Sequence, residues 1–131
     1  MFTATRLSII DNNNIRFHTV LTNMGNDYNS SSGVFTCRIA GQYWFSASIT
    51  KSETNNVGDT FCYIMINGNA KMLMEHYERD ALHAYFSMSA SAGFHLNRGD
   101  RVQVGNCGHP GFLHIGVMSS YFSGFLIRPN V

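Results

Sequence analysis

Residues 17–47 read FHTVLTNMGNDYNSSSGVFTCRIAGQYWFSA, and their pattern decides the fold class. Apolar and polar residues alternate from Ile15 to Leu21, as in a strand with one buried face. Residues 25–33 are turn formers, too polar to be buried and too many for a tight hairpin. Residues 34–39 form a second short strand, and residues 42–49 resume after a glycine with one apolar face. This order predicts an antiparallel β-sandwich rather than a simple hairpin meander.

The rest of the chain is also predicted to form short strands separated by turns. Residues 84–96 give the clearest signal, because strict alternation over this length excludes a helix. Residues 70–79 would also fit about one and a half turns of helix, but the neighbouring strands favour β-structure. Asn67-Gly68 predicts a tight hairpin. The further predicted strands are Thr3–Ile10, Thr60–Ile66, Ala70–Arg79, Ala84–Leu96, Arg101–Val104 and Tyr121–Ile127, with polar turns at 11–14 and 52–59 and a Gly-rich loop, or loop plus short strand, over Gly105–Ser119.

Length and composition indicate one β-rich domain over residues 1–131. Aromatic residues make up 13% of the chain and charged residues 13%, which is unlike a disordered segment. A net charge of +1 gives no electrostatic case for nucleic acid or an anionic membrane. No apolar run approaches the ~20 residues that span a bilayer. Residues 1–7 lack the hydrophobic segment of a signal peptide, although a mature secreted chain would look the same.

The central stretch resembles the signature of the globular-head domain of the complement C1q family, at the family's own spacing. Ala47 stands where that family usually has a further aromatic residue. Residues 120–127 resemble its closing strand, and residues 98–102 resemble its turn into the penultimate strand. The resemblance covers nearly the whole chain and implies an antiparallel jelly-roll β-sandwich of about ten strands. The matching residues of the central stretch are Phe17, Asn23, Tyr28, Phe35, Gly41, Tyr43 and Phe45.

Two strands carry a prediction about assembly. Residues 60–66 and 121–127 are apolar on both sides, whereas a sandwich covers only one face of each sheet. We therefore expect self-association, and the resemblance implies a homotrimer. The candidate interface residues are Trp44, Tyr121 and Phe125. The alternative role for Trp44 is to stack on a sugar ring, but the alternation along its strand favours a position in the subunit interface.

The three cysteines are odd in number and lack metal-site spacing. The resemblance implies that the strand holding Cys62 lies antiparallel beside the strand ending near Cys107. A Cys62–Cys107 disulfide is therefore expected, with Cys37 as a buried thiol. A link between two chains through one thiol is the alternative.

Several other motifs are interpreted as structural. No nucleophile elbow or paired carboxylates indicate an enzyme. His109 and His114 share a loop without accompanying acids, and residues 114–120 lack the carboxylates that calcium requires at the trimer apex of some relatives. We predict no metal and no cofactor.

The tripeptide Arg98-Gly99-Asp100 is expected to be a turn in which glycine supplies the bend and aspartate the cap, rather than an adhesion motif. Residues 29–31 form a glycosylation sequon.

The predicted function is sugar recognition by a secreted, extracellular pattern-recognition protein of innate immunity, because the chain resembles stalkless, lectin-like members of the family. Loops of a sandwich can vary without disturbing its core, so a binding site is expected there. Acetamido groups suit neutral donors, so glycans containing N-acetylhexosamine or sialic acid are the predicted partners. The alternative is a trimeric ligand of the tumour necrosis factor type that binds a protein receptor. The candidate sugar-binding residues are Asp59, Tyr77, Asn106, His109, Phe112 and His114.

Overall fold

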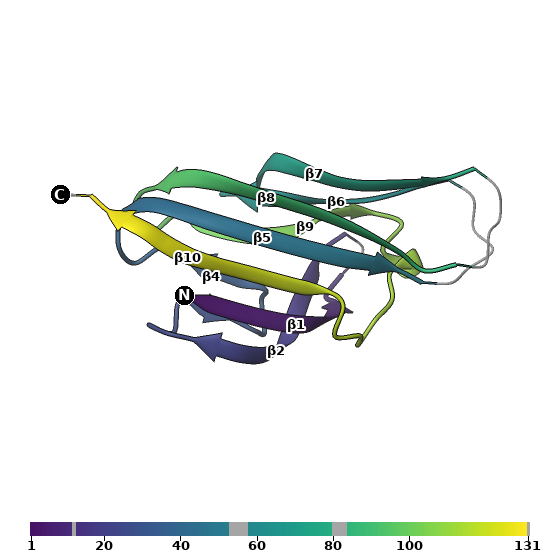
Figure 1. Ribbon diagram of the computed structural model, residues 1–131, viewed down its shortest axis with the longest axis horizontal. Helices are drawn as coiled ribbons and strands as arrows, with labels where there is room; N and C mark the ends of the chain where they lie inside the picture. Colours follow the sequence, from purple (N-terminus) through teal and green to yellow (C-terminus); the bar gives the residue numbers. More distant parts are fainter. Residues whose placement is uncertain (12, 53–57, 80–83, 131) are drawn as a thin grey trace.

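The computed structural model describes residues 1–11, 13–52, 58–79 and 84–130 (Figure 1). In that part of the chain, two antiparallel sheets of five strands each lie face to face. The first sheet has the order β2-β1-β10-β5-β8, and the second has the order β3-β4-β9-β6-β7. The elements are β1 (Phe2–Ile9), β2 (Ile15–Asn23), β3 (Tyr28–Asn29), β4 (Val34–Thr36), β5 (Gly41–Lys51), β6 (Gly58–Ile66), β7 (Asn69–Glu78), β8 (Phe86–Leu96), β9 (Arg101–Gly108), the 3₁₀ helix η1 (Pro110–Phe112) and β10 (Tyr121–Pro129).

The predicted jelly-roll sandwich of about ten strands is confirmed, and most predicted strands lie within a few residues of their predicted bounds. The ambiguous segment 70–79 is a strand, β7. The Asn67-Gly68 hairpin is also confirmed, since both residues have positive φ angles of 52° and 81°. Among the described residues, no helix is long and apolar enough to cross a membrane.

Three boundaries differ from the prediction. The polar excursion 25–33 contains the short strand β3, which pairs with β4. Strand β6 begins at Gly58, so Asp59 belongs to a strand rather than to the predicted loop; residues 53–57 of that loop lie outside the described residues. Strand β9 continues to Gly108, so Asn106 also belongs to a strand, because residues 105–108 pair with β6. The cause in each case is pairing between strands, which outweighs the local turn composition.

Signature residues of the central stretch hold the first loop to the core. The Tyr28 hydroxyl donates to the Phe17 carbonyl (2.8 Å) and accepts from the Phe17 N–H (3.1 Å). The Asn23 side chain accepts from the Tyr28 N–H (3.1 Å) and donates to the Tyr28 carbonyl (2.8 Å). Burial of the hydroxyl raises the pKa of Tyr28 to about 12. The ring of Tyr28 stacks on Phe2, with centroids 4.8 Å apart, so the loop is anchored to the aromatic core.

The core lies between the inner faces of the two sheets. Phe45 is fully buried and packs against Phe2, Phe35 and Phe122. Gly124 allows this packing, because a Cβ atom there would lie 2.5 Å from the Phe45 ring. A disulfide joins Cys62 on β6 to Cys107 on β9, as the resemblance implied, and Cys37 is a buried free thiol.

Candidate functional site

The sandwich has two chemically different ends. Figure 1 shows both chain termini at one end, which we call the terminal end; it comprises Met1 and residues 24–27, 37–40, 97–100 and 129–130. The opposite end is called the η1 end, and it comprises Lys51, Ser52, Asp59, Tyr77, Glu78, Tyr85, Phe86 and residues 109–114. Strand β9 runs from one end to the other over 8 residues. At the usual rise per residue, the two ends are roughly 25 Å apart.

At the η1 end, His109 and Phe112 form a flat aromatic surface. Their rings stack with centroids 5.0 Å apart and an interplanar angle of 7°. His109 has a left-handed backbone (φ 55°) immediately before Pro110, which begins the 3₁₀ helix. Its Nδ1 lies 2.6 Å from the Asp59 carbonyl oxygen. Because a carbonyl only accepts, Nδ1 carries the proton, and Nε2 remains available to a ligand.

Asp59 connects this surface to strand β7. It is the cross-strand partner of Tyr77, whose side chain is 60% exposed. Its Oδ1 atom is buried and accepts no hydrogen bond from any residue that the structure describes. The neighbouring Glu75 carboxyl has a raised pKa, caused first by its hydrogen-bonding contact with Asp59 and then by the Asp59 charge. Asp59 therefore contacts the aromatic surface through its backbone carbonyl, whereas its carboxylate lies beside Glu75.

Two of the six candidate residues lie apart from this group. The His114 ring stacks on Tyr85 at 4.8 Å, and its backbone N–H donates to the Thr50 carbonyl (2.8 Å). Asn106 lies on β9, and its N–H donates to the Asn14 side chain (3.2 Å). The structure thus brings Asp59, Tyr77, His109 and Phe112 together and places His114 on an adjoining part of the same end. Asn106 contacts the β1–β2 turn through its backbone and lies on β9, so its placement in the predicted loop is wrong.

A buried ion pair supports the η1 end, and no pattern in the sequence indicated it. Lys51 Nζ lies 3.7 Å from Glu78 Oε2, and these side chains are only 1% and 3% exposed. The Ser52 N–H and hydroxyl both donate to the Phe112 carbonyl, at 2.8 and 2.9 Å. Lys51 also forms a β-bridge with Leu113. These contacts fix η1 against the end of β5, so the aromatic surface has a rigid base.

Three further rings at the η1 end were not among the candidate residues. His76 stacks on Phe86 at 4.1 Å and lies 3.4 Å from the Glu78 carboxylate. Tyr85 covers His114. Aromatic residues on strands that also pack a core carry no local signal that distinguishes them as site residues. Only the folded arrangement identifies them.

The terminal end contains the Arg98-Gly99-Asp100 turn. Gly99 has a positive φ of 94°, and the Asp100 carboxylate accepts from the Asn97 N–H (2.8 Å) and the Asn67 amide (3.0 Å). These bonds lower the pKa of Asp100, the Asn67 bond contributing most. Glycine thus supplies the bend and aspartate the cap, as the sequence indicated. Among the described residues, no group of three metal-binding side chains is present at either end.

The candidate interface residues lie together on the outer face of the first sheet. Phe125 on β10 is the cross-strand partner of Trp44 on β5, and Tyr121 lies further along the same face of β10. The exposed fractions of Phe125, Trp44 and Tyr121 are 43%, 39% and 37% respectively. Gly93 on β8 lies directly beside the Trp44 ring. Hydroxyl groups lie between these rings, because Ser123 on β10 is the cross-strand partner of Ser46, and Ser46 is hydrogen-bonded to Ser91.

Comparisons with known proteins agree with this architecture. The C1q domain family matches residues 1–127. The chain is similar to a complement C1q subcomponent of Rattus norvegicus, with 30% identity over 99% of this chain and 51% of that protein. It is also similar to complement C1q tumor necrosis factor-related protein 3 of Homo sapiens, with 34% identity over 88% of this chain and 45% of that protein. The chain therefore spans about half the length of the curated relatives it matches.

Solved structures show the same fold. The globular domain of zebrafish complement 1qA protein superposes with a TM-score of 0.73 and 19% identity, covering 98% of both chains. Murine APRIL at pH 5.0 superposes with a TM-score of 0.67 and 12% identity, covering 94% of both chains. At these identities, the likeness concerns the fold alone.

Proposed function

Because this chain belongs to the C1q domain family, we propose that it is a secreted, lectin-like recognition protein of innate immunity that binds N-acetylated sugars at its η1 end. The observation that carries the proposal is the stacked His109–Phe112 surface together with the His109 Nε2 atom, which the contact of Nδ1 with the Asp59 carbonyl leaves as an acceptor. A sugar ring presents an apolar C–H face and a rim of hydroxyl groups, and it requires both features together. No enzymatic role is proposed.

Each of the gathered side chains has a place in such a complex. The His109–Phe112 surface would pack against the C–H face of the sugar ring. The His109 Nε2 atom would accept a hydrogen bond from a hydroxyl group or the acetamido N–H. Tyr77, at 60% exposure, would close one side with its ring and hydroxyl. The preferred ligands would be neutral N-acetylhexosamines, because the carboxylate of a sialic acid would lie near those of Asp59 and Glu75.

A shallow site of this kind binds a single sugar weakly. We expect millimolar dissociation constants for monosaccharides, corresponding to ~−4 kcal/mol. Several sites on one assembly would raise the apparent affinity for a cell surface through avidity. The proposed assembly is a homotrimer formed through Trp44, Tyr121 and Phe125. Burying each exposed aromatic side chain there would contribute roughly 1.5–3 kcal/mol.

Agglutination of cells tests the sugar proposal. The wild-type protein should agglutinate erythrocytes, and N-acetylglucosamine should inhibit this. The double variant His109→Ala/His114→Ala should lose agglutination while keeping its oligomeric state. The matched control is His18→Ala/His95→Ala, which removes two exposed histidines elsewhere on the first sheet and should keep activity. Sugar-inhibitable agglutination by the first double variant would show that the site lies elsewhere.

Light scattering tests the assembly separately. The wild-type chain should have three times the mass of the monomer at micromolar concentration. Phe125→Lys should produce monomers, because it places a charge in the proposed interface. Leu73→Lys is the matched control, since Leu73 is 46% exposed on the second sheet and should tolerate the same change. A monomeric wild-type chain would contradict the proposed trimer.

The alternative is a trimeric signalling ligand that binds a protein receptor. The similarity to complement C1q tumor necrosis factor-related protein 3 favours it, at 34% identity over 88% of the chain. The two functions differ in their response to sugar. A signalling trimer would assemble as above but would neither agglutinate cells nor bind N-acetylglucosamine.

A further inference from the structure

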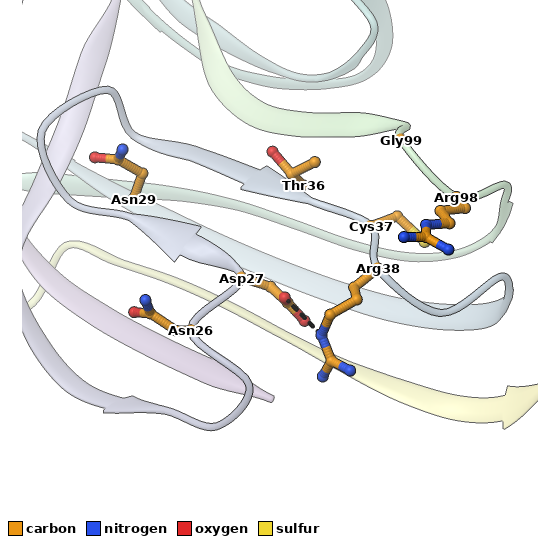
Figure 2. A pocket seen from close by; sticks show the side chains of 8 residues that line it. All are labelled: Asn26, Asp27, Asn29, Thr36, Cys37, Arg38, Arg98 and Gly99. Atoms are coloured by element: carbon orange, nitrogen blue, oxygen red, sulfur yellow. Dashed lines mark hydrogen bonds and ion pairs between the residues drawn. The ribbon is translucent and has the colours of Figure 1, made fainter.

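The terminal end contains a hollow of about 420 Å³ that the proposed sugar site does not use (Figure 2). Its lining comes from three separate turns and from β3 and β4. Asn26 and Asp27 precede β3, Thr36 ends β4, and Arg38 lies in the connection to β5. Arg98 reaches it from the turn between β8 and β9. The hollow is therefore built by tertiary contacts, and its volume is enough for a monosaccharide.

Backbone hydrogen bonds hold the two arginine-bearing segments together. The Gly99 N–H donates to the Cys37 carbonyl (2.8 Å), and the Cys37 N–H donates to the Asp100 carbonyl (2.7 Å). Arg98 and Arg38, which immediately flank these bonded residues, are consequently fixed on the same side of the hollow, as Figure 2 shows. The fold thus places the two arginines on adjoining segments, with the Arg38 guanidinium turned toward Asp27 (Figure 2).

Nearby acids neutralise only part of this charge. Arg38 Nε is paired with Asp27 Oδ1 at 3.1 Å, which leaves its two terminal nitrogens. Both oxygens of Asp100 already accept hydrogen bonds, from Asn67 and from the Asn97 N–H. Within the described part of the chain, the Arg98 guanidinium has no hydrogen bond or ion pair. The lining therefore carries the charges of Arg38 and Arg98 against that of Asp27, with the charged Asp100 in the same turn as Arg98.

The uncharged groups around the hollow present donors rather than acceptors. Asn29 also lines it, and its Oδ1 accepts from the Ser31 and Ser32 N–H groups, so its NH₂ group remains. Asn26 Oδ1 is similarly used by the Asn23 side chain (3.4 Å). Thr36 adds an exposed hydroxyl. The unbonded Arg98 guanidinium and these donors together favour a ligand with a carboxylate and several further acceptors.

We propose that this hollow is a second binding site, specific for carboxylated sugars such as uronic acids. The carboxylate would bind the planar fork of Arg98, with the terminal nitrogens of Arg38 nearby. Ring hydroxyl groups would accept from the amides of Asn26 and Asn29 and from Thr36. This site goes beyond the proposed N-acetyl-sugar function and does not depend on it, because it lies at the other end of the sandwich.

Nuclear magnetic resonance titration tests the site, with D-glucuronate as the probe and D-glucose as its neutral counterpart. The full chain is prepared with Asn29 unmodified, verified by intact mass, because a glycan on this sequon would cover the hollow. Glucuronate should shift the backbone amide signals of Thr36, Arg38 and Gly99, and glucose should not. Arg98→Gln should weaken glucuronate binding about tenfold, as expected for loss of a charge-assisted bidentate bond.

Arg128→Gln is the matched control, because it removes an equally exposed arginine near the same end, outside the hollow. At constant ionic strength it should change the affinity by less than about twofold. Equal losses in the two variants, or equal binding of glucose, would overturn the proposal. Inorganic sulfate that binds as tightly as glucuronate would also overturn it, since the sugar ring would then contribute nothing. In His109→Ala/His114→Ala, glucuronate binding should persist, which separates this proposal from that of the η1 end.

Discussion

The two ends of the sandwich are built from the same kind of element but by different interactions. At the η1 end, aromatic rings lie over a buried ion pair, Lys51–Glu78, that is 1% and 3% exposed. At the terminal end, the corresponding ion pair, Arg38–Asp27, is 53% and 15% exposed, and hydrogen-bonded polar turns surround it. One end therefore offers an aromatic surface over a buried ion pair, and the other offers a hollow lined by two arginines.

This difference suggests a division of roles. A neutral sugar gains little from charge, and it needs a fixed apolar surface together with a few unpaired acceptors or donors. An acidic sugar gains from guanidinium groups that are held in place but not neutralised. The fold supplies both environments without a change in the core, because loops at opposite ends of a sandwich vary independently.

The largest expected effect comes from breaking the two ion pairs in parallel. Glu78→Gln removes a buried carboxylate that pairs with Lys51 and His76, and we expect a larger loss in the free energy of unfolding than for an exposed pair. Asp27→Asn removes the exposed pair and should cost about 0–1 kcal/mol. Urea unfolding of both variants measures the difference. Similar losses would mean that the two ends are not distinguished by burial of charge.

The next effect concerns the cysteines. The Cys62–Cys107 disulfide ties β6 to β9 directly before His109, so Cys62→Ala/Cys107→Ala should lower the stability by about 2–5 kcal/mol. Cys37→Ala at the terminal end removes only a small buried thiol and should cost about 1 kcal/mol. Thermal unfolding of the oxidised protein compares the two. A larger loss in Cys37→Ala would contradict this ranking.

The smallest effect is a pH dependence of opposite sign at the two ends. The pKa of Asp100 lies below its usual value of 3.8 in the folded chain. The charged Asp100 therefore stabilises the fold above pH 3.8, and this stabilisation is lost as the pH falls through the folded pKa. Asp59 raises the pKa of Glu75 above its usual value of 4.5. The charged Glu75 therefore lowers the free energy of unfolding at pH values above its folded pKa. This loss is absent below 4.5, where the carboxyl is protonated in both the folded and the unfolded chain.

Unfolding measurements at pH 7 and pH 3 test this pair of signs. At pH 7, Asp100→Asn should be less stable than the wild type and Glu75→Gln more stable. Both differences should shrink at pH 3. A stabilising Asp100→Asn change at pH 7 would show that the Asn67 and Asn97 hydrogen bonds do not favour the charged carboxylate.

Much of the fold was predictable because its signals are local. Alternation along residues 84–96 defines β8, and the Asn67-Gly68 pair defines a hairpin. The end of β9 was not predictable, since Gly105 and Asn106 have the composition of a loop. Gly105 is required by a tertiary contact instead, because a Cβ atom there would lie 2.6 Å from Asn14 Oδ1.

The candidate sites were predictable to a smaller degree. His109 and Phe112 are only three residues apart in the sequence, so one turn is enough to bring their rings together. The sequence did not indicate that Lys51 and Glu78 form a buried ion pair, because isolated charged residues normally lie in solvent. Arg38 and Arg98 are far apart in the chain, and only the hydrogen bonds between Cys37 and residues 99–100 bring them together.

The central claim is that the η1 end binds N-acetylated sugars, and mapping N-acetylglucosamine onto the backbone amides tests it most directly. At millimolar sugar, the amide signals of Asp59, Tyr77, His109 and Phe112 should shift together along one saturation curve, and those of Thr36 and Gly99 should stay unchanged. Shifts confined to the terminal end, or to the outer face around Trp44, would contradict the claim.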